Sequence, residues 1–466
     1  MASVGRLDAA QVDDKRDLRK VIAASFIGTT IEWYDFFLYG TAAALVFNEL
    51  FFPNVDPLIG TLSAFATFAV GFAARPIGGI VFGHFGDRIG RKSMLVLSLL
   101  IMGVATFLIG CLPTHASIGI AAPILLVILR FAQGIGVGGE WGGAVLMAVE
   151  HAPKGKRGFY GSWPQMGVPA GLLLSTVVFT VIQNMTTEAQ FLAWGWRIPF
   201  LVSIVLVLVG LFIRLAVMES PAFKEVKDSG TQVDKPIVEL VKTQKRDVLT
   251  AMGMRIAENG TFYILTVFVL AYGEETLKLD KNTVLTGVII AASIGLFTIP
   301  LYGMLSDRIG RRKVYMAGAL FSLAFAFPFF MLVDTKEPVL IWLAIVLGVN
   351  VGHDLMYGPQ AAYFSELFAT RVRYTGASVG YQLASVFAGG FAPLIAVALL
   401  AAGGDEPYLV AIYMSVMALI TVIATYFARE TYRQDIGDTD AEARPATQRF
   451  VRTAAEDREP ETTGLR

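Results

Sequence analysis

The nine residues GHFGDRIGR at positions 83–91 recur as GMLSDRIGR at positions 303–311. Each copy directly follows a long apolar stretch and combines glycine with an aspartate and two arginines. A second repeat follows each copy, because Glu150 and Arg157 have the same spacing as Glu366 and Arg373. Two repeats in the same order predict a duplicated chain whose halves fold alike, and this arrangement is typical of secondary transporters.

Long apolar stretches surround both copies of the repeat. A helix needs about 20 residues to cross the hydrocarbon core of a membrane. Twelve such stretches predict an all-α membrane protein with twelve transmembrane helices in two pseudo-symmetric six-helix bundles. They lie near residues 20–48, 59–84, 93–113, 117–149, 159–184, 194–217, 249–274, 283–305, 313–333, 338–366, 374–402 and 406–428.

The composition excludes several classes of function. Hydrophobic residues make up 55% of the chain and charged residues 16%, unlike an ordinary soluble domain. The formal net charge of +0 offers no basic field for a nucleic acid, and no G-x-x-x-x-G-K-[ST] loop is present to bind a nucleotide. Four scattered histidines and the single Cys111 argue against a metal site or a catalytic centre. A membrane enzyme and a channel remain the alternatives from other classes.

The basic residues between the predicted spans indicate the orientation, because basic loops stay in the cytoplasm. They follow the second, fourth and eighth spans and fill the middle loop, so both termini are expected in the cytoplasm. The predicted parts are a cytoplasmic N-terminal tail (1–19), an N-terminal six-helix bundle (20–217), a cytoplasmic linker (218–248), a C-terminal six-helix bundle (249–428) and a disordered cytoplasmic C-terminal tail (429–466). We expect a monomer.

The repeated G-x-x-x-D-R-x-G-R loop in a twelve-span chain resembles the signature of the major facilitator superfamily. Within it, the chain resembles the metabolite:H⁺ symporter family through EWYDFF (32–37), RP (75–76), GGEWGG (138–143), WGWRIPF (194–200), ESP (219–221) and RYTGAS (373–378). The resemblance covers about residues 20 to 430. It implies the major facilitator fold and import through the plasma membrane, driven by a proton gradient and without a cofactor.

The resemblance also bounds the substrate. Members of the family carry shikimate, 2-oxoglutarate, citrate and other carboxylates, or the zwitterions proline and betaine. The stretch TEAQF at 187–191 and the pair His353-Asp354 look closest to shikimate permeases. A small organic acid similar to shikimate is therefore the first expectation, and a zwitterionic osmolyte is the second.

Charged side chains in the N-terminal half are the first candidates for transport chemistry, because each one inside a span costs about 2.5–3.5 kcal/mol on insertion scales. Glu32 and Asp35 share one face of the first span, and Arg75 and Arg130 are natural counter-charges. We expect Glu32, Asp35, Arg130 and Glu140 to couple transport to protons, and Arg75 and Arg130 to bind the substrate anion. Structural ion pairs, or an Arg75 that bonds carbonyls freed by a proline, are the alternatives.

Other polar side chains could complete a substrate site. His353 titrates near physiological pH and could relay protons or donate to the substrate. We assign the binding set Arg75, Arg130, Gln133, Gln165, His353, Asp354, Tyr357 and Gln360. A satisfied core histidine is an equal alternative for His353, whereas Arg255 and Glu258, at i and i+3, are expected simply to neutralise each other.

The repeated loops predict a gate at the cytoplasmic side, where arginines of both loops bridge to carboxylates such as Glu150 and Glu366. We expect these contacts to hold the outward-facing state, with plain positive-inside topology as the alternative. The predicted gating residues are Gly83, Asp87, Arg88, Gly90, Arg91, Glu150, Arg157, Asp307, Arg308, Arg311, Glu366 and Arg373.

Overall fold

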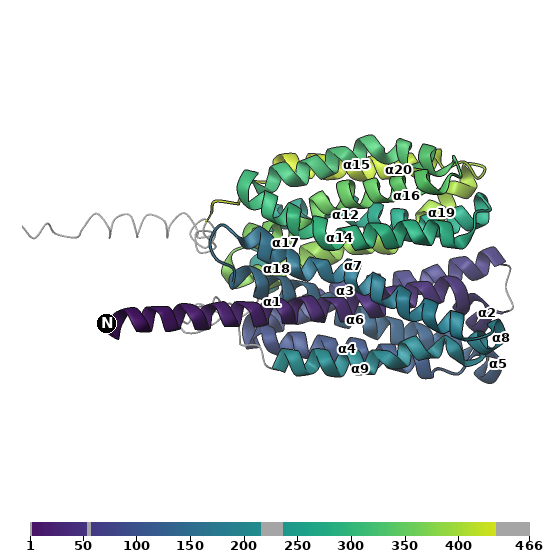
Figure 1. Cartoon of the computed structure of the whole chain (residues 1–466), viewed down its shortest axis with the longest axis horizontal. Coiled ribbons are helices and arrows are strands. Elements are labelled where there is room, and N and C mark those ends of the chain that lie inside the picture. The colour runs from purple at the N-terminus through teal and green to yellow at the C-terminus, as the bar shows by residue number, and fades with distance from the viewer. Residues whose placement is uncertain (1, 54–56, 216–235, 435–466) are drawn as a thin grey trace, which may run out of the picture.

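A computed structural model describes residues 2–53, 57–215 and 236–434, and every regular element in these ranges is a helix. The helices form two bundles that lie side by side (Figure 1). The N-terminal bundle contains α1 (Ala2–Ala42), η1 (Ala43–Phe47), α2 (Asn48–Phe51), α3 (Pro57–Ile89), α4 (Arg91–Cys111), α5 (His115–Ile118), α6 (Ala121–Glu150), α7 (Arg157–Met185), α8 (Glu188–Gln190), η2 (Phe191–Gly195) and α9 (Arg197–Leu215).

The C-terminal half repeats this plan with more irregular helices. It contains α11 (Pro236–Thr243), α12 (Lys245–Tyr263), η3 (Ile264–Phe268), α13 (Val269–Ala271), η4 (Tyr272–Thr276), α14 (Lys281–Ile309), α15 (Arg311–Val333), α16 (Pro338–Val346), η5 (Leu347–His353), α17 (Asp354–Leu367), η6 (Thr370–Val372), α18 (Arg373–Ser385), η7 (Val386–Gly390), α19 (Ala392–Ala402) and α20 (Tyr408–Phe427). The η elements are short π-helical turns inside longer spans, except the 3₁₀ turn η6.

The structure confirms the predicted all-helical membrane fold. Eleven described helices are long and apolar enough to span a membrane, and a twelfth span results if the pair Glu188–Gly195 and Arg197–Ile213, bent by 44°, is counted as one. In this pair π-helical turn η2 ends at Gly195 and the straight helix begins at Arg197. The predicted sixth span is thus a bent one.

The boundaries of the predicted parts differ from the observed helices at three places. Helix α1 begins at Ala2, so the predicted tail 1–19 continues the first span as a helix that projects from the bundle (Figure 1). Helix α12 begins at Lys245, inside the predicted linker, of which residues 218–235 lie outside the described ranges. The predicted disordered tail is wrong for Arg429–Gln434, which pack on the C-terminal bundle through hydrogen bonds such as Tyr363 Oη to Arg429 O at 2.8 Å; residues 435–466 are not described.

Glycines let α3 and α6 approach backbone to backbone. A Cβ atom on Gly138 would lie 2.1 Å from the carbonyl oxygen of Arg75, and one on Gly134 would lie 2.1 Å from that of Gly71. Small residues at such positions permit close helix packing in membranes. Gly134, Gly138 and Gly142 recur every four residues along α6 and serve two contacts, because a Cβ atom on Gly142 would lie 2.1 Å from Ser378 Oγ of the other half.

Replacing Gly138 by alanine should destabilise the N-terminal bundle, because the new methyl group meets rigid backbone. Overpacking of this kind costs about 1–3 kcal/mol, and backbone moves less easily than side chains. We expect Gly138→Ala to lower the melting temperature of the purified protein by several degrees. Gly40→Ala is the matched control, since its Cβ would be 3.5 Å from Phe68; equal melting temperatures of the two variants would contradict the packing argument.

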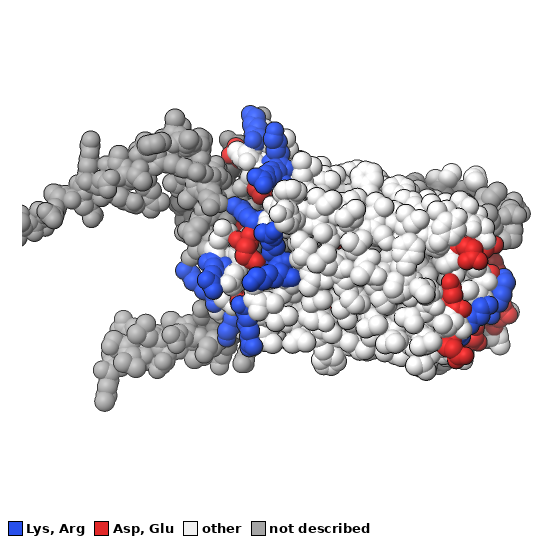
Figure 2. Space-filling view, turned by 90° about the horizontal axis from the view of Figure 1, so that it is seen from above, with Lys and Arg blue, Asp and Glu red and all other residues white. Residues whose placement is uncertain are grey.

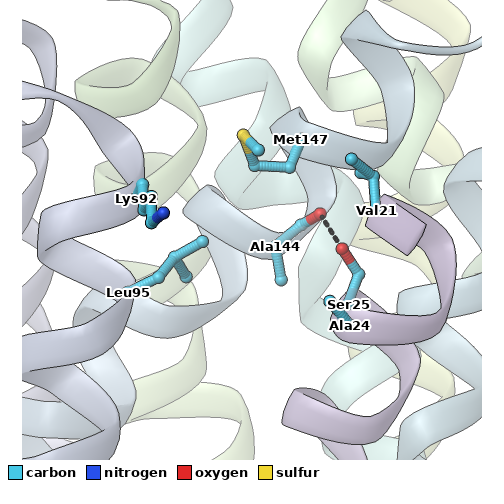
Figure 3. Close-up of a pocket in the computed structure, with 7 residues that line it drawn as sticks. All are labelled: Val21, Ala24, Ser25, Lys92, Leu95, Ala144 and Met147. Atoms are coloured by element: carbon cyan, nitrogen blue, oxygen red, sulfur yellow. Dashed lines mark hydrogen bonds between the residues drawn. The ribbon is translucent and has the colours of Figure 1, made fainter. Parts of the chain in front are cut away.

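Charge is sorted between the two ends of the molecule. Lys and Arg gather at the end where α1 begins, and Asp and Glu dominate the described surface of the opposite end (Figure 2). The α3–α4, α6–α7 and α14–α15 connections lie at the basic end (Figure 1). A broad uncharged band separates the two ends, as a hydrocarbon layer requires.

Candidate functional site

Four charged side chains of the N-terminal half lie in the core of the molecule. Glu32 and Asp35 come from α1, Arg75 from α3 and Arg130 from α6, and none is more than 2% exposed. Helix α1 presents both carboxyl groups on one face, because they are three residues apart. The structure thus places all four residues of the predicted charged set inside the bundle, away from lipid.

The two guanidinium groups lie in an aromatic environment. The Cζ atom of Arg75 is 4.0 Å from the ring centre of Phe72 and 4.5 Å from that of Phe36. The Cζ atom of Arg130 is 4.1 Å from the ring centre of Tyr39 and 4.8 Å from that of Phe36. Both arginines therefore share the ring of Phe36, and these cation–π contacts hold the side chains without using up their N–H donors.

Several donors and acceptors in this cluster have no protein partner. Among the described residues, Nε and Nη2 of both Arg75 and Arg130 lack a hydrogen bond, as do both carboxyl oxygens of Asp35. Arg130 Nη1 donates to Gln133 Oε1 at 2.5 Å, and Gln133 Nε2 donates to Thr106 Oγ1 at 2.7 Å, so Gln133 orients this arginine. Buried polar groups are usually satisfied, so the unsatisfied guanidinium groups are candidates to bind a substrate anion.

The C-terminal half closes this cluster from the opposite side. The ring of Tyr263 lies 5.4 Å from that of Phe72 and 6.1 Å from that of Phe36, between ring centres. Within the described ranges, the hydroxyl groups of Tyr263, Tyr357 and Tyr381 and the Oδ1 atom of Asn259 have no hydrogen-bond partner. Neutral polar groups of the second half thus line the contact between the bundles, where a substrate hydroxyl could be bound.

A continuous polar network occupies the core of the C-terminal half. Arg255 Nη1 contacts Glu258 Oε2 and donates to Gln360 Oε1 at 3.0 Å. His353 Nε2 lies 3.2 Å from Glu258 Oε1, and His353 Nδ1 lies 2.8 Å from Asp354 Oδ1. The predicted residues His353, Asp354 and Gln360 come together here with Arg255 and Glu258. Glu258 contacts Arg255, His353 and Gln360 and so lies at the centre of the network, although it was not among the predicted site residues.

An aromatic stack joins this network to the N-terminal half. The guanidinium of Arg255 lies 3.2 Å from the ring centre of Tyr381, whose other face stacks on Trp141 at 3.6 Å between ring centres. Gln165 accepts a hydrogen bond from Trp141 Nε1 at 2.7 Å and donates to Tyr357 O at 3.2 Å. The predicted binding residue Gln165 therefore connects the two bundles. Glu140 lies elsewhere, where it accepts from Ser98 Oγ at 3.0 Å.

The cytoplasmic gate is built around Asp307 and Arg311. Asp307 accepts hydrogen bonds from the N–H groups of Gly158 (2.8 Å) and Phe159 (2.9 Å), at the first turn of α7 in the other half. Arg311 pairs with Asp307 at 2.7 Å and with Glu366 at 3.2 Å. A carboxylate at a helix N-terminus is stabilised by unpaired N–H groups and by the helix dipole, so these contacts hold the halves together at the basic end.

The other predicted gating residues do not all make the expected contacts. Glu150 was expected to pair with an arginine of the repeated loops, but it pairs with Arg373 across the halves at 3.3 Å. Arg88 and Arg308 are exposed, and the side chains of Asp87 and Arg91 lie outside the description. Gly90 and Gly310 have φ values of 132° and 111° at the starts of α4 and α15, which favours glycine. Gly83 faces Thr375 of α18, whose Cα would lie 3.0 Å from an added Cβ.

Glu430 is a functional candidate that sequence reasoning missed. Its Oε1 accepts from the N–H of Arg311 at 2.9 Å, and its Oε2 accepts from the N–H of Arg312 at 3.1 Å, so it caps α15 from beyond α20. The neighbouring Thr431 donates to Glu366 Oε2 at 2.6 Å, and Arg157 of the other half donates to Gln434 O at 2.9 Å. The echo of Glu219-Ser220 in Glu430-Thr431, after spans six and twelve, was the available signal.

Removing this cap should loosen the gate. Glu430→Ala leaves the first N–H groups of α15 without their carboxylate, and loss of a cap costs about 0.5–2 kcal/mol. We expect faster cleavage by a protease added to the basic end, and a lower melting temperature. The exposed Glu406→Ala at the opposite end is the matched control; if the two variants behave alike, Glu430 has no role in holding the gate.

Two like-folded bundles around buried charges define a membrane carrier, and the comparisons give its family. The family model of the Major Facilitator Superfamily matches residues 25–389, and the chain belongs to this superfamily. It is 46% identical over 417 residues to the shikimate transporter of Escherichia coli (strain K12), covering 89% of this chain and 95% of that one. It is 37% identical over 434 residues to the proline/betaine transporter of the same strain, covering 91% and 86%.

A solved structure supports the fold. The proton:xylose symporter XylE bound to 6-bromo-6-deoxy-D-glucose matches with a TM-score of 0.74 over 92% of this chain and 100% of that chain, at 18% sequence identity. These relatives are transporters and not enzymes, so the protein is a multi-pass membrane transporter of the major facilitator superfamily.

Proposed function

We propose that the protein imports a small organic acid together with protons, with a hydroxylated monocarboxylate similar to shikimate as the preferred substrate. The single observation that carries this proposal is the pair of buried guanidinium groups, Arg75 and Arg130, with unpartnered N–H donors on both. A guanidinium fork matches a carboxylate in shape and charge. The 46% identity to a shikimate transporter supports the same substrate class.

Charge balance links the anion to the proton. In this proposal Glu32 and Asp35 are ionised in the empty site and offset the charges of Arg75 and Arg130. An arriving carboxylate adds a negative charge to a buried cluster, and uncompensated buried charge is costly. Protonation of Glu32 or Asp35 restores neutrality, so the substrate and the proton are taken up together. Glu140 lies apart from this cluster and is the weaker coupling candidate.

The second half supplies specificity in this proposal. Tyr263, Tyr357, Tyr381 and Asn259 offer neutral polar atoms opposite the arginines, and aromatic rings offer flat apolar surface. A small ring that bears one carboxylate and several hydroxyl groups matches both surfaces. Transport then alternates between the two sides as the bundles rock about this central site, and the contacts around Asp307 close the cytoplasmic side.

A zwitterionic osmolyte is the second candidate, because the proline/betaine transporter is 37% identical to this chain. An ammonium group can lie on aromatic rings. Here, however, the rings of Phe36, Phe72 and Tyr39 already contact two guanidinium groups, which repel a further cation. The geometry therefore favours the acid.

The location follows from the same proposal. The basic end, where α1 begins, faces the cytoplasm of a bacterial inner membrane by the positive-inside rule. The basic residues between the spans of the sequence favour cytoplasmic termini on the same ground. The partners are the organic acid, protons and the lipid bilayer; the protein works as a monomer and needs no cofactor.

Uptake by proteoliposomes tests the proposal. Labelled shikimate, 2-oxoglutarate, citrate, a benzoate-type acid, proline and betaine are each offered with and without an inward proton gradient. Accumulation of shikimate only with the gradient is the expected result. Accumulation of proline or betaine instead would move the substrate to the osmolyte class, and uptake of all compounds without regard to the gradient would refute proton coupling.

A further inference from the structure

His353 lies between two carboxyl groups in the core of the C-terminal half. Its Nδ1 atom is 2.8 Å from Asp354 Oδ1, its Nε2 atom is 3.2 Å from Glu258 Oε1, and none of the three residues is more than 3% exposed. We propose that Glu258, His353 and Asp354 form a second proton-binding site, separate from the cluster of Arg75 and Arg130. We call these three residues the histidine triad.

Counting hydrogens supports the proposal. An ionised carboxylate only accepts hydrogen bonds, and a neutral imidazole has one N–H donor and one bare acceptor nitrogen. The two short contacts of His353 therefore need two hydrogens, while a neutral histidine between two ionised carboxylates supplies one. The geometry holds one proton more than that neutral arrangement, either on the imidazole or on one of its carboxyl partners.

The remaining oxygens of the histidine triad are already satisfied. Gln360 Nε2 donates to Glu258 Oε2 at 3.0 Å, next to the Arg255 contact, and Asn350 Nδ2 donates to Asp354 Oδ2 at 2.8 Å. Thr298 donates to the same Asp354 oxygen at 2.5 Å. Neither carboxyl group can turn away from His353 without losing these bonds, so the extra proton has a fixed place.

Charge balance points the same way. Arg255 carries one positive charge against the two negative charges of ionised Glu258 and Asp354. A protonated His353 makes the four groups neutral, whereas a neutral imidazole leaves one net negative charge in the bundle core, which is costly. The groups that face the histidine triad from the packed helices include Arg255, Phe262, Thr298, Asn350, Tyr357 and Gln360, together with the tyrosines Tyr302, Tyr315 and Tyr381.

The shared proton links side chains from different helical elements. Glu258 lies on α12, whereas His353 ends the π-helical turn η5 and Asp354 begins α17. Such π turns are frequent at functional sites. If the proton leaves, one ring nitrogen faces a carboxylate without a hydrogen between them; when that nitrogen is Nε2, the hydrogen bond between α12 and η5 is lost. Proton release would thus loosen two helices of the C-terminal half.

The place of this proton in a transport cycle rests on the proposed function, but its presence can be measured on the protein alone. Histidine labelled with ¹⁵N in the full-length protein in nanodiscs reports whether a ring has one or two N–H groups. We expect the His353 signal to be that of a doubly protonated ring at about pH 7.5, above the usual histidine pKa of about 6.5. Asp354→Asn should convert it to a neutral ring.

Replacing His84, His115 and His151 one at a time assigns the remaining signal to His353 even if His353→Gln does not fold. These three side chains are only partly buried, unlike His353. A His353 signal with one N–H at about pH 7.5, and no protonated carboxyl partner by infrared difference spectroscopy, would overturn the proposal.

Transport then shows whether this proton moves. With the membrane voltage clamped at zero and a gradient of about one pH unit, one coupled proton is worth 1.36 kcal/mol, or tenfold in the accumulation ratio. We expect His353→Gln to lower this limiting ratio of labelled shikimate about tenfold. An unchanged ratio in the variant would show that the proton is held but not transported. Absence of any gradient-driven accumulation in the wild type would refute the proposed function and leave the spectroscopic result standing.

Discussion

Arg75→Lys and Arg130→Lys should each reduce substrate uptake by about a hundredfold or more. Lysine keeps the charge but loses the planar fork and the stacking on Phe36, so the replacement is not conservative here. Loss of a buried charged contact costs about 2–5 kcal/mol, and every 1.4 kcal/mol is tenfold. Uptake and equilibrium binding of the labelled acid measure the effect.

Arg246→Lys is the matched control for both variants, because Arg246 is exposed in the first turn of α12. It should transport like the wild type. We also expect Arg130→Lys to disturb the hydrogen bond to Gln133, so Gln133→Ala should weaken uptake less than Arg130→Lys does. If both lysine variants bind the acid as tightly as the wild type, the anion is not held by these guanidinium groups.

Asp307→Asn should open the cytoplasmic gate. An amide side chain cannot accept hydrogen bonds from the N–H groups of Gly158 and Phe159 with both of its terminal atoms, and it no longer attracts Arg311. Loss of a charged cap costs about 1–2 kcal/mol, which changes the equilibrium between closed and open states by about 5- to 30-fold. The variant should therefore face the cytoplasm more often and accumulate less substrate.

Reactivity of a single cysteine measures this opening. The chain has one cysteine, the exposed Cys111, so Cys111→Ser gives a background without reactive thiols. Ser162→Cys then places a thiol at a fully buried position of α7 that faces Gly303 of α14. We expect Asp307→Asn to raise its reaction with an impermeant maleimide from the basic end about tenfold. Glu337→Gln, exposed at the opposite end, should not; a gate variant that stays equally protected would contradict the role of Asp307.

The sequence predicted the fold well because two strong signals agree. Apolar stretches of spanning length are set by bilayer thickness, and the repeat at 83–91 and 303–311 orders them into halves. The bend at Trp196 and the π turns were not predicted, since neither leaves a periodicity signal. The start of α1 at Ala2 was missed because the polar residues 1–19 were expected to form a separate tail.

The candidate site was predicted in part. The free-energy cost of placing a charge inside a membrane span marked Glu32, Asp35, Arg75 and Arg130 individually as candidates. The structure buries all four in the core of one bundle. Pairing was harder, because contacts such as Glu150 with Arg373 depend on how two distant helices meet. Glu258 was underestimated for a related reason. Arg255, three residues away, suggested that the two charges simply neutralise each other. His353, with which Glu258 is proposed to bind a proton, is far away in the sequence.

The two buried charge clusters differ in how completely they are satisfied. All four carboxylate oxygens of Glu258 and Asp354 have partners, whereas the arginines of the N-terminal half keep donors without partners among the described residues. A bound anion would fill those donors and stabilise the native state by mass action, so melting curves recorded against a library of acids would identify the natural ligand without any transport assay.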